Sequence, residues 1–162
     1  MKKLYFLFSV LAIAVTANAQ NLVTNPTFAN ELTGWSASGT GYALPNHVTN
    51  DGQDDSFSVQ YVATATTGFD QKFSVVPGAT VTVSFWYKAA RTNGAATGNT
   101  ARIWGVFQAD GDTTPINPPG TTGSANDPLR NNNLYLAQAA TWTQVTVTSE
   151  VPANAATFSL QF

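Results

Sequence analysis

Hydrophobic and polar residues alternate along much of this chain with the period of two that is typical of β-strands. In the clearest case, residues 80–88, one face is apolar or aromatic and the other is mostly polar. The first face carries Val81, Val83, Phe85 and Tyr87, and the second carries Thr82, Ser84, Trp86 and Lys88. A strand with one face on the core and one in water has this pattern. We therefore predict a half-buried strand here, with Trp86 pointing outward.

Two further segments, 56–62 and 156–162, show the same alternation. The residues predicted to face inward are Phe57, Val59 and Tyr61 in the first and Phe158, Leu160 and Phe162 in the second. Turn signals such as Pro77-Gly78, a glycine-rich loop over 92–100 and a long irregular segment over 110–133 separate the alternating runs. Many short strands with Gly/Pro turns predict an all-β fold, an antiparallel β-sandwich.

The first 19 residues have the three parts of a secretory signal peptide. Lys2 and Lys3 precede an apolar run over 4–15, and Ala17-Asn-Ala19 provides a small-residue cleavage site. The apolar run is too short for a membrane-spanning helix, which needs about 20 residues. We therefore expect no membrane span and a secreted protein, extracellular or on the cell surface, whose single mature domain covers residues 20–162.

Composition narrows the classes of function. Cleavage of the leader would leave five basic against nine acidic residues, so a clustered basic surface for nucleic acid is not expected. The chain has no cysteine, which excludes thiolate metal sites and thiol nucleophiles. The many hydroxyl and amide side chains suit an uncharged ligand bound by hydrogen bonds, although they also suit plain solubility.

The motifs of known enzymes are missing from the sequence. His47 is the only histidine, and neither a Gly-x-Ser-x-Gly nor a His-Glu-x-x-His pattern occurs. A glycosidase needs two carboxylates at a defined separation, and nothing distinguishes a pair such as Asp54 and Glu150. We predict a protein without an active site of its own, and no cofactor other than a structural calcium ion.

Three blocks of sequence together resemble one known family. They are NLVTNPTFAN over 21–30 followed by Gly34-Trp35, the segment 76–88, and TWTQVTVT over 141–148 followed by Val151-Pro152. These blocks are similar to the CenC-like carbohydrate-binding modules of families 4, 9 and 22, which have a galactose-binding-like jelly-roll fold. The resemblance covers nearly all of residues 20–162. It implies a jelly roll that binds a polysaccharide or oligosaccharide.

The family has one more strand after the segment that resembles 156–162. This chain ends at Phe162, before that strand, and the resemblance therefore implies an unpaired strand edge. We expect that the sequence is a fragment of a longer polypeptide, or that another segment or molecule fills the edge.

A sugar site needs an aromatic ring whose face meets the apolar face of a pyranose, with hydrogen-bonding groups nearby. In residues 102–107, the alternation directs Arg102 and Trp104 outward, so Trp86 and Trp104 are predicted to share one platform on adjacent strands, flanked by Lys88 and Arg102. The alternative is that either tryptophan lies in the core. The other two tryptophans are predicted to be structural: Trp35 in the core, and Trp142 at the start of the last hairpin.

Four further residues complete the predicted ligand site. Gln60, with Lys88 and Arg102, would provide hydrogen bonds, and Tyr42 and Tyr135 would line a cleft rim. Phe69 lies near a position where members of the family carry an exposed aromatic residue. The alternative for each of these aromatic residues is that it packs against neighbouring side chains and does not contact a ligand.

Metal binding is a separate possibility. The family often holds a structural calcium ion through a Glu directly after the opening Phe, but here Ala29 follows Phe28. The acidic cluster in 50–55 offers hard oxygens, without the spacing of an EF-hand loop, and a polar turn is the alternative. The candidate ligands for calcium are Glu31, Asp51, Asp54 and Asp55.

Two functions of different classes follow. The first is a secreted, non-catalytic carbohydrate-binding module, which would serve alone or as part of a larger secreted enzyme such as a glycoside hydrolase. The second is a structural or adhesive surface protein that self-associates through an unpaired sheet edge, because strand addition needs such an edge.

Overall fold

A computed structural model describes residues 20–62, 65–89 and 101–162. The predicted leader, 1–19, and the predicted glycine-rich loop, 92–100, lie outside these residues. All strand pairs in the described residues are antiparallel, and the only helical segments there are two short 3₁₀ turns. The strands are β1 Ser36–Ala37, β2 Asn46–Thr49, β3 Phe57–Gln60, β4 Phe69–Ser74, β5 Thr80–Ala89, β6 Trp104–Gln108, β7 Ala139–Glu150 and β8 Thr157–Gln161; the 3₁₀ turns are η1 Ser124–Asn126 and η2 Pro128–Asn133.

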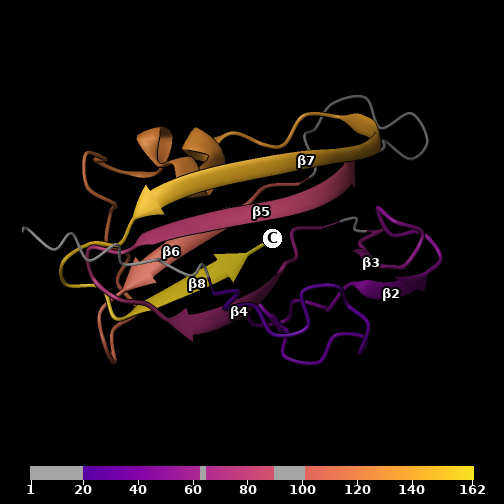
Figure 1. The fold of residues 1–162 in the computed structure, drawn as a ribbon, viewed down its shortest axis with the longest axis horizontal. Helices are drawn as coiled ribbons and strands as arrows, with labels where there is room; N and C mark the ends of the chain where they lie inside the picture. The colour runs from indigo at the N-terminus through magenta and orange to yellow at the C-terminus, as the bar shows by residue number, and fades with distance from the viewer. Residues whose placement is uncertain (1–19, 63–64, 90–100) are drawn as a thin grey trace, which may run out of the picture.

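Three sheets form the described part of the chain (Figure 1). The largest has four strands in the order β1-β4-β8-β6, and the hairpin β2-β3 stands apart from it. The two longest strands, β5 and β7, pair only with each other, with Val83 opposite Val147 near the middle of the register. The prediction of an all-β, antiparallel fold is confirmed.

The core lies between the four-stranded sheet and the inward face of β5 and β7. Aromatic rings from both sheets meet there: Phe85 of β5 lies 4.8 Å from Phe162, and Phe162 lies 5.5 Å from Phe69 of β4, between ring centroids. At the other end of the core, Phe158 packs 4.9 Å from Phe107. The alternation in these strands places their large apolar side chains on one face.

The opening motif folds as a loop that is fastened to β4. The Gln71 side chain accepts a hydrogen bond from the Thr24 amide at 2.6 Å and donates to the carbonyls of Thr24 and Gly34. Trp35 lies in the core with only 7% of its surface exposed and packs 5.6 Å from Phe28. The core position predicted for Trp35 is confirmed.

The predicted alternation holds in β5, holds for the inward residues of β8 and holds only in part of β3. Ser159 of β8, predicted to face outward, is buried. Val59 and Tyr61 pack against the core, whereas Phe57 is exposed and stacks on the His47 ring at 5.4 Å. Ser58, predicted to face outward, is buried. The inward prediction for Phe57 was wrong because β3 belongs to the separate hairpin, and only its C-terminal end reaches the core.

The segment 110–133 is more ordered than its proline-rich sequence predicts. The Ile116 amide donates to the Phe107 carbonyl at 2.8 Å, and η1 and η2 follow. Leu129 of η2 is fully buried and belongs to the core. This segment therefore covers the free edge of β6 instead of forming an open loop.

No helix within the described ranges has the length and the apolar character needed to cross a membrane.

Candidate functional site

One candidate surface is the outward face of the β5-β7 pair, which we call the hydroxyl face. Its side chains are Thr80, Thr82, Ser84, Trp86 and Lys88 from β5 and Trp142, Gln144, Thr146, Thr148 and Glu150 from β7. The register pairs hydroxyl with hydroxyl across the strands, and the side-chain oxygens of Ser84 and Thr146 lie 3.0 Å apart. The face is therefore a strip of hydrogen-bonding groups that runs along both strands.

Trp86 is the exposed aromatic ring of this strip. It lies directly opposite Gln144, and 43% of its surface is accessible. The Gln144 side-chain amide donates to the Ser84 hydroxyl at 3.1 Å, so the amide stays in the plane of the strip beside the indole. An exposed tryptophan among polar neighbours is an exception to the burial of large apolar side chains.

Trp142 lies on the same face, diagonal to Trp86. The Lys88 ammonium group lies 4.7 Å from the centroid of the Trp142 ring and forms an ion pair with Asp51. A cation over an aromatic face is held by the electrons of the ring. Lys88 therefore occupies one face of Trp142 and leaves Trp86 as the more open indole of the strip.

The structural role of Trp142 stays a prediction, and the structure adds that its half-buried side chain shares the outward face and packs under Lys88. The signal was present in the sequence. In residues 141–148, Trp142 has the same parity as Gln144, Thr146 and Thr148, whereas Val145 and Val147 have the inward parity.

A second candidate surface is a cleft of about 270 Å³ at the end of the four-stranded sheet, which we call the Arg102 cleft. The described residues that line it are Ser38, Tyr42, Thr66, Thr67, Gly68, Arg102, Trp104, Gln161 and Phe162. The Arg102 guanidinium lies 5.1 Å from the Trp104 ring and 4.3 Å from the Tyr135 ring. Four of the predicted ligand residues, Tyr42, Arg102, Trp104 and Tyr135, therefore gather here.

Two glycines shape the rim and the floor of this cleft. Gly41 has φ of +78°, which suits the tight turn in which the Tyr42 amide bonds to the Gly39 carbonyl at 3.1 Å. Gly68 lets β4 and β8 approach, because a Cβ atom there would meet the Phe162 carbonyl oxygen at 2.7 Å. The first glycine sets the position of Tyr42 and the second that of Phe162.

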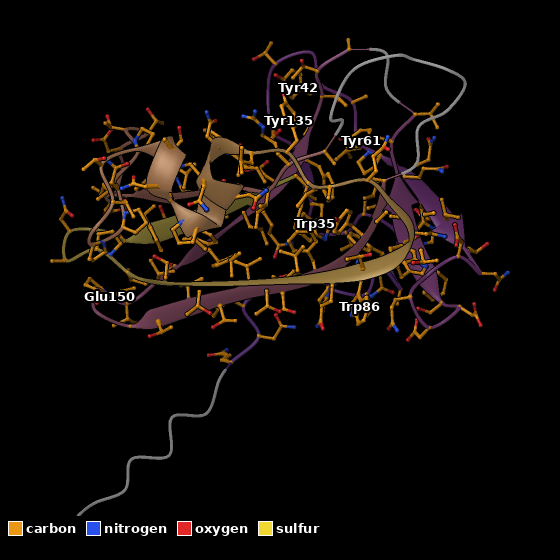
Figure 2. All side chains as sticks on the ribbon, turned by 90° about the horizontal axis from the view of Figure 1, so that it is seen from above. Trp35, Tyr42, Tyr61, Trp86, Tyr135 and Glu150 are labelled. Atoms are coloured by element: carbon orange, nitrogen blue, oxygen red, sulfur yellow. The ribbon has the colours of Figure 1, made fainter. Side chains whose placement is uncertain are left out.

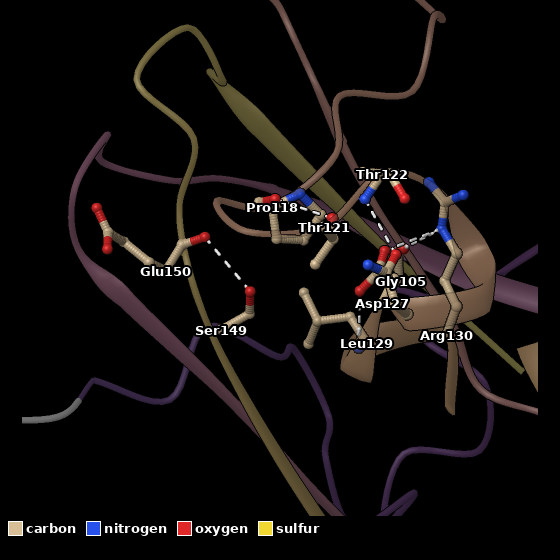
Figure 3. A network of polar contacts seen from close by, with 10 residues as sticks. Gly105, Pro118, Thr121, Thr122, Asp127, Leu129, Arg130, Ser149 and Glu150 are labelled. Atoms are coloured by element: carbon tan, nitrogen blue, oxygen red, sulfur yellow. Dashed lines mark hydrogen bonds and ion pairs between the residues drawn. The ribbon is translucent and has the colours of Figure 1, made fainter. Parts of the chain in front are cut away.

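Behind Trp104, a buried ion pair fixes the edge of the sheet (Figure 3). Arg130 donates from Nε to the Gly105 carbonyl at 3.2 Å and lies 3.3 Å from the Asp127 carboxylate. The Arg130 guanidinium also lies 5.0 Å from the Trp104 ring. Asp127 accepts a hydrogen bond from the Leu129 amide, and burial raises the pKa of its carboxyl group. Trp104 is thus held by arginines rather than left standing free.

The outward row beside Trp104 is polar. Across the sheet, Trp104 is paired with Gln161, and Gln161 with Asp70. Burial raises the pKa of Asp70, while the Ser159 hydroxyl, which donates to it at 3.1 Å, and the charge of Lys72 act in the opposite direction. This row extends the polar groups of the cleft across the sheet.

A third hollow, of about 360 Å³, adjoins the Arg102 cleft, since Thr66 and Thr67 line both. Gln60 and Tyr61 line this hollow, and the Tyr61 hydroxyl donates to the Ala43 carbonyl at 2.7 Å. Burial raises the pKa of Tyr61. Gln60 therefore lies on the side of the Arg102 cleft.

The structure corrects the prediction that Trp86 and Trp104 share one platform. Their strands belong to different sheets, since β5 pairs with β7 and β6 pairs with β8. Figure 2 shows Trp86 on one side of the molecule and Tyr42 and Tyr135 on the other, with Trp35 between them. The predicted residues thus divide into Lys88 and Trp86 on the hydroxyl face and the remaining surface residues around the clefts. The alternation within one strand shows which side chains share a face, but it does not show to which sheet the strand belongs.

Phe69 is the other correction. It is only 6% exposed and packs between Trp35 and Phe162 in the core, so its ring offers no surface to a ligand. The apolar face of β4 points inward, and Phe69, the first residue of that strand, lies on this face.

The acidic candidates for calcium take part in other contacts or lie in turns. Among the described residues, no three Asp, Glu or His side chains form a group that could hold a metal ion. Asp51 pairs with Lys88, and the Asp54 carboxylate accepts from the Ser56 hydroxyl, which lowers the Asp54 pKa. Asp55 and Glu31 adopt positive φ values of 62° and 54° in turns. The calcium site remains a prediction.

Comparison of the chain with protein-family models, with curated proteins and with solved structures gave no match.

Proposed function

We propose that this chain is a secreted, non-catalytic carbohydrate-binding module that binds a neutral polysaccharide across the hydroxyl face. The observation that carries the proposal is the exposure of Trp86 within a strip of hydroxyl and amide groups. An indole offers a large, rigid, electron-rich surface to the C–H face of a sugar ring. Ser84, Gln144 and Thr146 would then meet the hydroxyls at the ring edge. A jelly-roll sandwich is the finer fold that we infer for such a module.

The length of the face favours an extended chain over a single sugar. The strip follows β5 and β7 over most of their length, and its hydroxyl pairs repeat at every second residue. Such a module would raise the local concentration of an attached enzyme on its substrate, by the effective-concentration effect of linked domains.

Affinity electrophoresis through gels containing hydroxyethylcellulose, xylan or glucomannan tests this function. We expect retardation by at least one of these polymers, and Trp86→Ala to weaken it by about 30-fold, because truncation of a central tryptophan typically costs about 2 kcal/mol or more. Trp86→Tyr keeps a ring and should retain much of the binding.

Val76→Ala is the matched control, since Val76 is exposed and apolar but lies in the turn before β5. Equal thermal unfolding of all variants would show that the fold is intact. Normal mobility in all three gels, or full retardation of Trp86→Ala, would reject the proposal.

A second candidate function is self-association, and one observation favours it. β5 runs for ten residues and pairs with β7 on one side, while no strand of the described residues pairs with its other side. A long open edge is a template for the addition of another strand. In this case the occupant would be the same edge of a second copy of the chain.

A further inference from the structure

The Arg102 cleft contains a positive charge without an acidic partner. Among the described side chains that line it, only that of Arg102 is charged at neutral pH. Within the described part of the chain, ion pairs join Lys88 to Asp51 and Arg130 to Asp127, and none joins a carboxylate to Arg102. The Nε atom of Arg102 is buried and makes no hydrogen bond to a described residue. A buried donor without a partner has a free-energy cost, and the terminal nitrogens of the guanidinium, which are not buried in this way, are the atoms that could meet a ligand.

Two aromatic rings hold the Arg102 guanidinium in place. It lies 4.3 Å from the centroid of Tyr135 and 5.1 Å from that of Trp104. Stacking on aromatic rings fixes the plane of a guanidinium, and its parallel N–H groups match the two oxygens of a carboxylate. The cleft therefore presents a preorganised fork for a planar anion.

The other lining groups match a sugar. Hydroxyls come from Ser38, Thr66 and Thr67, an amide comes from Gln161, and the ring of Tyr42 forms the rim. The volume of about 270 Å³ lies just below that of pockets for drug-sized ligands and suits a single sugar ring. One charge among several hydroxyls and aromatic rings favours one carboxylate on a polyhydroxylated ring over a phosphate cluster.

We propose that the Arg102 cleft is a second ligand site, which binds a uronic acid residue of an acidic glycan with its carboxylate on Arg102. The proposal goes beyond the neutral polysaccharide of the hydroxyl face, because the ligand carries a charge and the cleft lies on the opposite side of the molecule. Binding at the Arg102 cleft does not depend on Trp86, so each of the two sites can be tested without the other.

Calorimetric titration with charged and uncharged forms of the same sugar tests the site. The probes are trimers of galacturonate, glucuronate and mannuronate, each compared with its methyl ester, and the protein carries a short Gly-Ser tail that moves the terminal carboxylate away from Phe162. We expect at least one acid to bind about 10-fold or more tightly than its ester at low salt, with the difference shrinking as salt rises. Equal binding of acid and ester, or no binding of any acid, would overturn the proposal.

Two kinds of variant locate the binding. Arg102→Gln should abolish the preference for the acid, and Arg102→Lys, which keeps the charge but not the fork, should reduce it. Because Arg102 also supports Trp104 and Tyr135, a second pair leaves it untouched: Thr66→Glu places a competing carboxylate at an exposed lining position, and Thr66→Gln is its uncharged match.

Thr66→Glu should weaken binding of the acid about 10-fold, by pairing with Arg102 in place of the ligand, while Thr66→Gln should not. Trp86→Ala should bind the acid as the parent does. Unchanged affinity in both Arg102→Gln and Thr66→Glu would overturn the site even if the acid binds elsewhere.

Discussion

At the scale of single residues, exposure and contact separate tryptophans that look alike in the sequence. Trp35 is enclosed by Phe28 and Phe69, and Trp104 is held by Arg102 and Arg130. Trp86 has no such cover, because its strand places it on the outward face opposite a glutamine. The same side-chain type thus contributes to the core at one position and offers a binding surface at another.

Gly105 provides a prediction about the wall behind the Arg102 cleft. A Cβ atom there would lie 2.7 Å from Cζ of Phe158 and 3.0 Å from Cβ of Leu129, both fully buried. We expect Gly105→Ala to lower the free energy of unfolding by about 1–3 kcal/mol, since overpacking a filled core has a cost of this order. Chemical denaturation followed by tryptophan fluorescence measures it.

Gly123→Ala is the control for Gly105→Ala. Gly123 has an extended backbone, and a Cβ atom there would meet nothing within 4 Å. The free energy of unfolding of the Gly123→Ala variant should stay within about 0.5 kcal/mol of that of the parent, as is usual for surface substitutions. A loss as large as that of Gly105→Ala would contradict the packing described for β6, β8 and η2.

At the scale of elements, the sequence predicts which face of a strand is buried better than it predicts which strands are paired. The alternation over 80–88 correctly orients β5, because burial of one face has a local period of two. It could not predict that β5 pairs with β7 and not with β6, since pairing depends on contacts between distant segments. The division of the predicted ligand residues between two surfaces follows from that pairing, whereas the core position of Phe69 follows from the inward face of β4. The outward position of Trp142 could have been predicted from the alternation in residues 141–148, because Trp142 has the same parity as Gln144.

The open edge of β5 leads to a testable prediction about self-association, the second candidate function. If two copies pair through this edge, size-exclusion chromatography with light scattering should show a dimer that grows with protein concentration. Thr82→Lys should shift the equilibrium toward the monomer, because it adds like charges to neighbouring strands. Thr148→Lys is the control, since β7 lies on the other side of the pair. A monomer at every concentration would reject self-association.

At the scale of the whole molecule, the arrangement separates two kinds of chemistry. The hydroxyl face carries an open indole on a polar strip, and the Arg102 cleft carries a guanidinium in a hollow on the opposite side (Figure 2). A neutral chain and an acidic residue could then be bound at the same time without competition. The core between them, built from Phe69, Phe85 and Phe162, keeps the two surfaces apart.

The indole N–H resonances of the four tryptophans provide the most direct measurement of the central claim. They are assigned with single Trp→Phe variants and followed by NMR during titration with cellohexaose, xylohexaose and mannohexaose. Binding at the hydroxyl face predicts that at least one of these neutral oligosaccharides shifts the Trp86 signal most and the Trp142 signal less, and leaves those of Trp35 and Trp104 in place. A Trp86 signal that stays unmoved with all three, or shifts centred on Trp104, would contradict the account.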